Sequence, residues 1–373
     1  MRARDLGIRI GDLPTGPDNA ITDVDGVRVG HCTIVEGDGP LLIGRGPVRT
    51  GVTMVVPHDG NVWSEPIFAG YHRLNGNGEM TGIEWVREAG MLLSPIGITN
   101  THSVGVVRDT LVALEVEELG ADREAWALPV VGETWDGILN DVNGFHVRPD
   151  HARAAYAAAS AGTVAEGAVG GGTGMICHGF KGGIGTSSRV VPADAGGFTV
   201  GVLVQANHGR RARLSVDGVP VGRLVPPEVV PTPDVPPLLQ QGGGSIIGLV
   251  ATDAPLLPTQ CRRLAQRASF GVARTGGVGE NSSGDLFLAF STGNRGMPPC
   301  HYGDAPPLTS QVLMLSDSYV NALFDAVIEA TEEAIVNALV AAQTMTGVNR
   351  VTAHALPHHL LREAMAAPVK PRS

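Results

Sequence analysis

The stretch Gly242-Gly243-Gly244-Ser245-Ile246-Ile247-Gly248-Leu249-Val250-Ala251-Thr252 carries the most information about this chain. Three consecutive glycines run directly into an apolar segment typical of a buried strand, with Ser245 at the junction. Glycine accepts backbone angles that other residues resist, so the hydroxyl of Ser245 is expected to reach the carbonyl carbon of Gly244. Attack there gives an ester, and water then releases the chain before Ser245.

A serine freed in this way carries a nucleophile and a base on one residue. A terminal amine titrates at roughly pH 8, so a useful fraction is unprotonated at neutral pH and can take the hydroxyl proton. Both groups are then positioned by the end of one rigid strand. Taken by itself, the motif also fits a glycine turn before an ordinary strand, which is a common arrangement.

The segments on either side of this junction alternate between strand-like and helix-like patterns, which argues for α/β layers. Strands are predicted at residues 27–35, 51–57, 94–101, 126–134, 198–209, 245–252 and 285–292. Helices are predicted at residues 81–92, 102–120, 149–160, 258–275 and about 318–345.

A proline-rich stretch, residues 219–244, precedes the junction and has the composition of a domain boundary. The part that follows, residues 245–373, contains too few predicted strands to close a core by itself. Both halves are therefore expected to share one core, so that residues 1–373 form a single domain.

Composition excludes several classes of protein. The formal net charge is -10 and no long run of Lys or Arg occurs, so no nucleic acid partner is expected. The N-terminus lacks the apolar run of a signal peptide, and no segment is long and apolar enough to span a membrane. The four cysteines show no Cys-x-x-Cys spacing and are expected as reduced thiols, which suits a cytoplasmic protein.

The glycine-dense segment at residues 167–185 invites comparison with a phosphate-binding loop. Its Lys181 is followed by Gly182 rather than by Ser or Thr, so the Walker pattern is absent. Close packing of backbone at turns is the preferred interpretation.

Three histidines lie near the C-terminus: His354, His358 and His359. Their spacing suits a metal ligand set, but Pro357 interrupts a helix there, and a solvated tail is the preferred interpretation. No His-Glu-x-x-His motif occurs, so we predict no catalytic metal and no cofactor. His102 and His178 are left as candidates for residues that support the site.

Longer blocks of sequence resemble one known family. They include GSIIGLVATDAPLLPTQCRRLAQRASFGVARTGG at 244–277, NSSGDLFLAFSTGN at 281–294, VVGETWDGILNDVNGFHV at 130–147, GGGTGMICHGFKGGIGTSSR at 170–189, and AGYHRLNGNGEMTG at 69–82. They resemble blocks of the DmpA-type aminopeptidase family, which contains L-aminopeptidase/D-Ala-esterase/amidases and β-aminopeptidases. The resemblance covers nearly the whole chain, in order, and looks closer to the L-aminopeptidase/D-Ala-esterase branch.

The resemblance implies a four-layer α/β/β/α sandwich that processes itself into an α-chain, residues 1–244, and a β-chain, residues 245–373. It also implies a tetramer of such heterodimers. The implied activity is release of N-terminal amino acids from small peptides, amides and esters that carry a free amine. The specificity of the β-aminopeptidase branch is left open as an alternative.

Site residues follow from the resemblance by position. Ser245 matches the nucleophile, released by cleavage of the Gly244–Ser245 bond. Ser283 and Asp285 match a serine and an acidic residue that relay protons and hold the terminal amine, although β-aminopeptidases carry glutamate at the acidic position. Asn207 matches a donor to the oxyanion. Without the resemblance, these last three residues fit a turn and an ordinary strand end.

The substrate-binding residues are Glu133 and Trp135. Glu133 matches an acidic residue that binds the ammonium of the substrate, and its alternative interpretation is a solvated loop carboxylate. Trp135 stands where the family often has tyrosine, and an indole N–H donates but cannot accept a proton. Either Trp135 donates to the oxyanion, or Asn207 works with a backbone N–H.

Two other functions are compatible with parts of this pattern. An ornithine acetyltransferase-like enzyme uses the same processing chemistry, but with a threonine nucleophile, which Ser245 argues against. A scaffold protein that has lost catalysis is supported only by Trp135.

Overall fold

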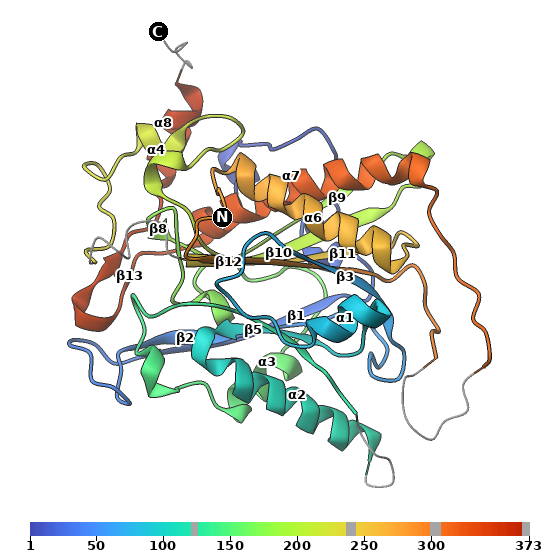
Figure 1. The fold of residues 1–373 in the computed structure, drawn as a ribbon. Helices are drawn as coiled ribbons and strands as arrows, with labels where there is room; N and C mark the ends of the chain where they lie inside the picture. Colours follow the sequence, from blue (N-terminus) through green and yellow to red (C-terminus); the bar gives the residue numbers. More distant parts are fainter. Residues whose placement is uncertain (121–125, 236–243, 299–306, 368–373) are drawn as a thin grey trace.

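The computed structural model describes residues 1–120, 126–235, 244–298 and 307–367, which fold around two sheets (Figure 1). The smaller sheet has four strands in the order β1-β2-β5-β6. Pairing is antiparallel between β1, β2 and β5, and parallel between β5 and β6. The strands are β1 (Arg28–Glu36), β2 (Val48–Val56), β5 (Ile96–Asn100) and β6 (Val130–Thr134).

The larger sheet has six strands in the order β4-β3-β12-β11-β10-β9. Only β11 and β12 run parallel to each other, and the other neighbours are antiparallel. The strands are β3 (Ile67–Arg73), β4 (Met91–Leu92), β9 (Gly183–Val190), β10 (Thr199–Asn207), β11 (Gly244–Thr252) and β12 (Ser283–Ser291). Strand β11, which begins at the sequence junction, is therefore hydrogen-bonded on both sides.

Helices cover the outer face of each sheet (Figure 1). Helices α6 (Pro258–Arg274) and α7 (Val320–Ala341) pack on the six-stranded sheet, and α2 (Val104–Leu119) and α3 (Pro149–Ala157) pack on the four-stranded sheet. The expected four-layer α/β/β/α sandwich is confirmed. The shorter elements are α1 (Ile83–Ala89), α4 (Val221–Leu224), α8 (His358–Ala366), β7 (Ile176–Cys177), β8 (Phe180–Lys181), β13 (Met345–Thr346) and β14 (Thr352–Ala353).

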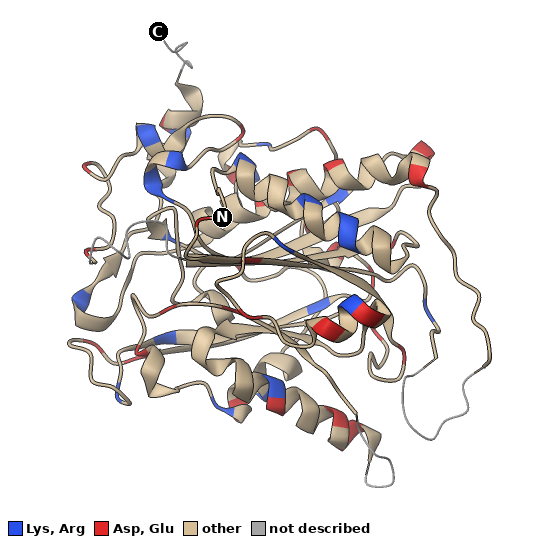
Figure 2. Cartoon of the chain, viewed as in Figure 1, with Lys and Arg blue, Asp and Glu red and all other residues tan. Residues whose placement is uncertain are grey.

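Strand β11 shows why the layers form. Ile247 and Leu249 point into the apolar cluster between the two sheets, whereas Ile246 and Val250 point into the cluster beneath the helices. Side chains of a strand alternate between faces, so a run that is apolar at every position must be covered on both sides. Figure 2 shows the same arrangement from the charges, which lie mainly on helices and loops and rarely on the strands.

Several predicted elements differ from the structure in their bounds, such as the strand predicted at 126–134, which begins at Val130, and the helix predicted at about 318–345, which ends at Ala341. The helix predicted at 81–92 ends at Ala89, because Gly90 takes a left-handed conformation with φ of 72° and the chain turns into β4. The solvated tail predicted around the C-terminal histidines is also wrong. Pro357 precedes α8 instead of interrupting it, and α8 buries Leu361.

None of the helices within the described ranges combines the length and hydropathy that crossing a membrane requires.

Candidate active site at the start of strand β11

Strand pairing places three distant segments around Ser245. On one side, Ser245 lies opposite Asn207, the last residue of β10. On the other side, Ser245 pairs with Gly284 and Gly244 pairs with Ser283, the first residues of β12. The C-terminal end of β10 therefore lies beside the N-terminal ends of β11 and β12. The predicted residues on these three strands are brought together there.

Ser245 is 4% exposed, and its Oγ accepts a hydrogen bond from the Gly284 N–H at 3.2 Å. The glycine before it is required by packing. A Cβ added to Gly244 would lie 2.0 Å from the carbonyl oxygen of Asn207. Gly244 does not have a positive φ, so close approach of two strands explains this glycine better than the torsional freedom expected from the sequence.

Ser283 and Asp285 are in contact beside Ser245. The Ser283 hydroxyl donates to Asp285 Oδ1 at 2.5 Å, so the shorter aspartate reaches the serine without a further methylene. Burial raises the pKa of Asp285, and hydrogen bonds from Ser283, the Ile246 backbone and Asn75 oppose that rise. The Ile246 contact places the carboxylate next to the Ser245–Ile246 peptide of β11.

Asn75 is a site residue that sequence reasoning missed. Its Nδ2 donates to Asp285 Oδ2 at 3.2 Å, and its Oδ1 accepts the Asp285 N–H at 2.6 Å. Nδ2 also reaches the Glu280 carbonyl oxygen at 3.0 Å. Asn75, from the loop after β3, thus donates to one oxygen of the Asp285 carboxylate, and Ser283 donates to the other. Asn75 lies within the family block at 69–82, which was its only signal.

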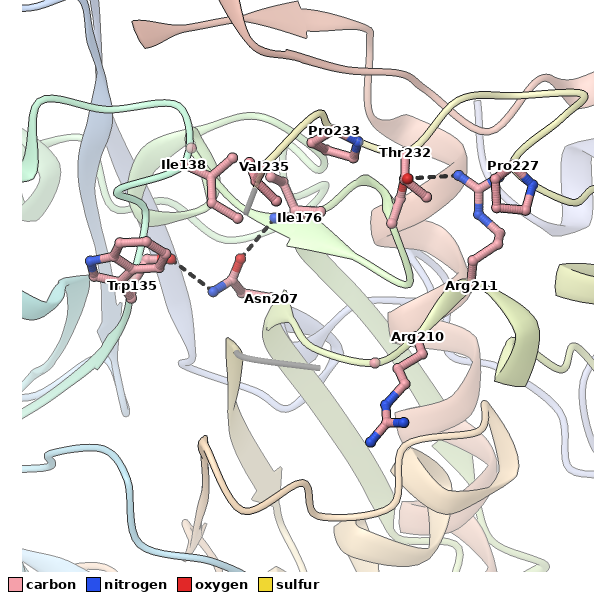
Figure 3. Close-up of a pocket in the computed structure, with 13 residues that line it drawn as sticks. Trp135, Ile138, Ile176, Asn207, Arg210, Arg211, Pro227, Thr232, Pro233 and Val235 are labelled. Carbon is pink, nitrogen blue, oxygen red and sulfur yellow. Dashed lines mark hydrogen bonds between the residues drawn. The ribbon is translucent and has the colours of Figure 1, made fainter. Parts of the chain in front are cut away.

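Asn207 is 6% exposed and held at both ends of its amide. Its Oδ1 accepts the Ile176 N–H at 2.8 Å, and its Nδ2 donates to the Trp135 carbonyl oxygen at 2.9 Å (Figure 3). An amide nitrogen has two hydrogens, so one remains for a further acceptor. Trp135 contributes its backbone to this contact, while its indole packs against Gly137.

Glu133 is not a solvated loop carboxylate. It lies on β6, is 3% exposed, and accepts hydrogen bonds from the Thr101 hydroxyl and from the Glu79 N–H, the latter at 2.9 Å. Burial raises its pKa, and these two donors oppose the rise. A Cβ on Gly78 would lie 3.2 Å from Glu133 Oε1 and 2.9 Å from Gly284 Cα. The carboxylate is therefore near the start of β12, the strand that pairs with β11 at Ser245.

A pocket of about 220 Å³ opens beside Asn207 on the β10 side of Ser245 (Figure 3). Its apolar walls come from separate segments of the chain: Trp135, Ile138, Ile176, Pro227, Pro233 and Val235. Arg210 also borders the pocket, but its side chain extends away from the apolar group and pairs with Glu280. The pocket and Glu133 thus lie on opposite flanks of Ser245.

Beneath Asn207, Cys177, His178 and His208 bring potential metal-ligand atoms within 4.8 Å of one another. Burial raises the pKa of the Cys177 thiol to about 12 and lowers the pKa of His178 to about 4. The pKa of His208 is also lowered by burial. All three groups are uncharged at neutral pH, so they can be buried together without a counter-charge.

Two further candidates from the sequence are Lys181 and His102. Lys181 is fully buried and donates from Nζ to the carbonyl oxygens of Met175 at 2.7 Å and Gly182 at 2.8 Å, which confirms close packing of backbone. His102 stacks on Phe145 with ring centroids 5.9 Å apart, and its Coulombic interaction with Glu133 lowers the pKa of that carboxyl.

Comparison with known proteins gives a consistent identity. Residues 19–353 match peptidase family S58. Beta-peptidyl aminopeptidase BapA of Sphingosinicella microcystinivorans is 50% identical over 97% of this chain and 91% of its own length. The structure of a Burkholderia sp. beta-aminopeptidase superposes with a TM-score of 0.91 at 55% identity, covering 98% of both chains.

A third relative is the L-aminopeptidase D-Ala-esterase/amidase of Ochrobactrum anthropi, a serine aminopeptidase with a variant of the Ntn hydrolase fold. Its TM-score is 0.87 at 46% identity, again over 98% of both chains. The chain is thus similar to members of both branches, at 50% and 55% identity to the two β-aminopeptidases above and 46% to this relative. The acetyltransferase and scaffold interpretations fall away, because the match is to a family of peptidases. This chain belongs to peptidase family S58 and is an aminopeptidase, a hydrolase of peptide bonds.

Proposed function

We propose that the chain cleaves its own Gly244–Ser245 bond and then uses Ser245 as the nucleophile of an aminopeptidase. Cleavage would divide it into an α-chain, residues 1–244, and a β-chain, residues 245–373, which share one domain. The observation that carries the proposal is the register of β10, β11 and β12. That register surrounds Ser245 with an amide donor on one side and a hydroxyl–carboxylate pair on the other.

Each neighbour has a defined task in the proposed reaction. The freed α-amine of Ser245 takes the proton of its own hydroxyl, and the Ser283 hydroxyl, held by Asp285, orients that amine. The remaining N–H of Asn207 stabilises the oxyanion as the acyl–enzyme ester forms. Water then attacks the ester and releases the acid.

Glu133 binds the ammonium of the substrate. A buried carboxylate with two hydrogen-bond donors selects a cation strongly, because an apolar or anionic group placed there would leave its charge uncompensated. This arrangement supports peptides, amides and esters with a free N-terminal amine as substrates.

The preferred acyl residue is a separate question. The 50% and 55% identity to β-aminopeptidases supports release of N-terminal β-amino acids. Release of L-residues and action on D-alanyl esters and amides form the second candidate, supported by the 46% identity to the Ochrobactrum anthropi enzyme. A matched panel of β-aminoacyl, L-aminoacyl and D-alanyl amides distinguishes them.

Two further properties belong to the proposal. We expect a tetramer of α/β heterodimers. We also expect a cytoplasmic location, supported by Cys32, Cys177 and Cys261, which are free thiols as in a reducing compartment.

The test is the variant Ser245→Ala. Wild-type protein should give two fragments on a denaturing gel, the smaller beginning Ser-Ile-Ile. The variant should give one uncleaved chain with no amidase activity, because it lacks the attacking hydroxyl. Ser282→Ala, which alters an exposed serine one residue before Ser283, should process and turn over normally. Wild-type chain that stays intact and still hydrolyses aminoacyl amides would rule out this mechanism.

A further inference from the structure

The apolar pocket beside Asn207 has no part in the chemistry described so far. Its walls are formed by Ile138 from the loop after β6, Ile176 from β7, and proline-rich residues 227–235. Ile138 and Ile176 are partly buried, Pro233 is buried, and the enclosed space measures about 220 Å³. Pockets for whole drug-sized ligands measure roughly 300–1,000 Å³, so this one suits a single large side chain.

The position of the pocket relative to Ser245 indicates which side chain. An aminopeptidase substrate has its ammonium on one side of the reacting carbonyl and the departing amine on the other. Glu133 lies on the β12 flank of Ser245, because it is next to Gly78, which in turn packs against Gly284. The pocket lies on the β10 flank, where Asn207 forms part of its wall.

The segment that joins Glu133 to the pocket indicates the direction in which a substrate lies across Ser245. Glu133 and Trp135 are separated by one residue, and the Trp135 carbonyl oxygen accepts from Asn207 Nδ2 at 2.9 Å. The chain therefore crosses from the carboxylate on one flank to the pocket wall on the other. A substrate whose ammonium sits at Glu133 and whose carbonyl oxygen sits at Asn207 directs its leaving group toward the pocket.

We infer that this pocket binds the apolar side chain of the residue that leaves, the second residue of the peptide. The inference rests on the proposed function. It adds that the enzyme prefers peptides with a large aliphatic or aromatic second residue over those with glycine there. The walls offer apolar contact, and both arginines of the lining already have partners. Arg210 is directed away and paired with Glu280, and Arg211 donates to the carbonyl oxygens of Val230 and Gly179.

A pocket for the leaving residue can be distinguished from a pocket for the acyl residue, because the two residues are present at different steps of the reaction. During acylation the Ser245 Oγ–carbonyl carbon bond forms, the carbonyl carbon–nitrogen bond breaks, and the second residue departs with the proton on its nitrogen. Hydrolysis of the acyl–enzyme then proceeds without that residue. A leaving-group pocket therefore affects acylation and leaves deacylation unchanged.

The experiment uses substrates that share one accepted acyl residue and end in phenylalanine, leucine or glycine, together with the methyl ester. Ile138→Trp should fill the pocket and lower kcat/KM for the phenylalanine and leucine peptides by about tenfold or more. The glycine peptide and the ester should change by less than about threefold. Ile138→Ala should also weaken the preference for phenylalanine, through lost contact. Val229→Trp, which adds the same bulk at a side chain 53% exposed and outside the pocket, should match wild type.

Deacylation and binding provide independent readouts. Partition of the acyl–enzyme between water and added hydroxylamine should be the same for every leaving group and the same in Ile138→Trp. N-Acetylphenylalaninamide has no free amine and so resembles only the carbonyl and the second residue of a substrate. It should bind the processed enzyme in a calorimetric titration, and Ile138→Trp should abolish that binding.

Several outcomes would overturn the inference. One is an unchanged phenylalanine-to-glycine ratio in Ile138→Trp. Another is a variant that instead changes preference among acyl residues with a common leaving group, which would assign the pocket to the acyl side chain. Wild-type protein that binds N-acetylphenylalaninamide but turns over no substrate would refute the proposed function and leave the pocket in place.

Discussion

At the scale of single residues, the candidate site is a set of buried polar groups that have partners. Ser245, Asn207, Ser283, Asp285 and Glu133 are each at most 6% exposed, and each has a hydrogen bond. A buried polar group without a partner is costly, so these contacts fix the side chains before substrate arrives. Glu133 and Asp285 are both carboxylates, and hydrogen-bond donors contact each of them.

Glu133→Gln should lower kcat/KM at neutral pH by about 100-fold, because the ammonium loses its counter-charge. In wild type, kcat/KM should fall as the pH drops through the raised pKa of Glu133, since only the ionised carboxylate binds the ammonium. The variant should lose this acid limb, which a pH–rate profile measures. Glu79→Gln provides the control. The charge of Glu79 helps to raise the pKa of Glu133, so this variant should keep the limb and shift it to lower pH.

The sequence located Ser245, Asn207 and Glu133, because family blocks surround them, but it gave no role to Asn75. A short polar side chain in a glycine-rich loop has no local pattern that distinguishes a grip on a carboxylate from an ordinary turn. The burial of Glu133 was likewise hidden. Its neighbours Thr101 and Glu79 come from other loops, and sequence spacing does not report such contacts.

At the scale of elements, the site depends on how β7 and β8 are held beneath Asn207. Burial lowers the pKa of Lys181 to about 7, and its Nζ donates to three carbonyl oxygens in the same turn region. That region includes Ile176, whose N–H fixes the Asn207 amide. A buried lysine thus supports the oxyanion donor through the backbone.

Lys181→Met should destabilise the protein by about 3 kcal/mol at neutral pH, since three carbonyl oxygens each lose a donor. The difference should grow with pH. Folded Lys181 binds fewer protons than the unfolded chain between about pH 7 and its ordinary pKa of 10.5, so its contribution to stability rises across that window. Urea unfolding at pH 7 and pH 9.5 measures this. Arg223→Met, at an exposed arginine of α4, should show neither effect, and an equal loss at both pH values would contradict the account.

Most strands and helices near the junction could be predicted from apolar periodicity, including β10, β11, β12 and α6. The pairing between them could not. Ser245 faces Asn207 only because β10 and β11 align in one antiparallel register, and a shift by one residue would turn every side chain to the opposite face. That register is decided by burial against both layers, which no single strand reveals.

At the scale of the whole molecule, buried ion pairs join the segments on either side of the proposed cut. Arg189 on β9 contacts Glu333 on α7 at 2.7 Å, with both side chains fully buried. Arg4 reaches the same carboxylate at 2.9 Å. Removal of one partner from such a pair is strongly destabilising, because the remaining charge is left uncompensated in the core.

We therefore expect the two chains to remain together after cleavage. Native size exclusion should give one particle from material that gives two bands under denaturing conditions. Arg189→Ala should lower stability by about 3–5 kcal/mol. Arg295→Ala should cost at most about 1 kcal/mol, since Arg295 pairs with Glu65 across the same two chains at a more exposed position. Thermal unfolding of the two variants makes the comparison, and equal losses would argue against the buried pair as the link.

The larger sheet contains strands from both sides of the proposed cut. Strands β12 and β11, which follow the cut in sequence, lie between β3 and β10, which precede it. Neither half of the polypeptide can assemble that sheet in the absence of the other. The groups that surround Ser245 meet only when the last strand has docked. The proposed cleavage would thereby depend on correct folding, because a precursor that fails to assemble would lack the completed site.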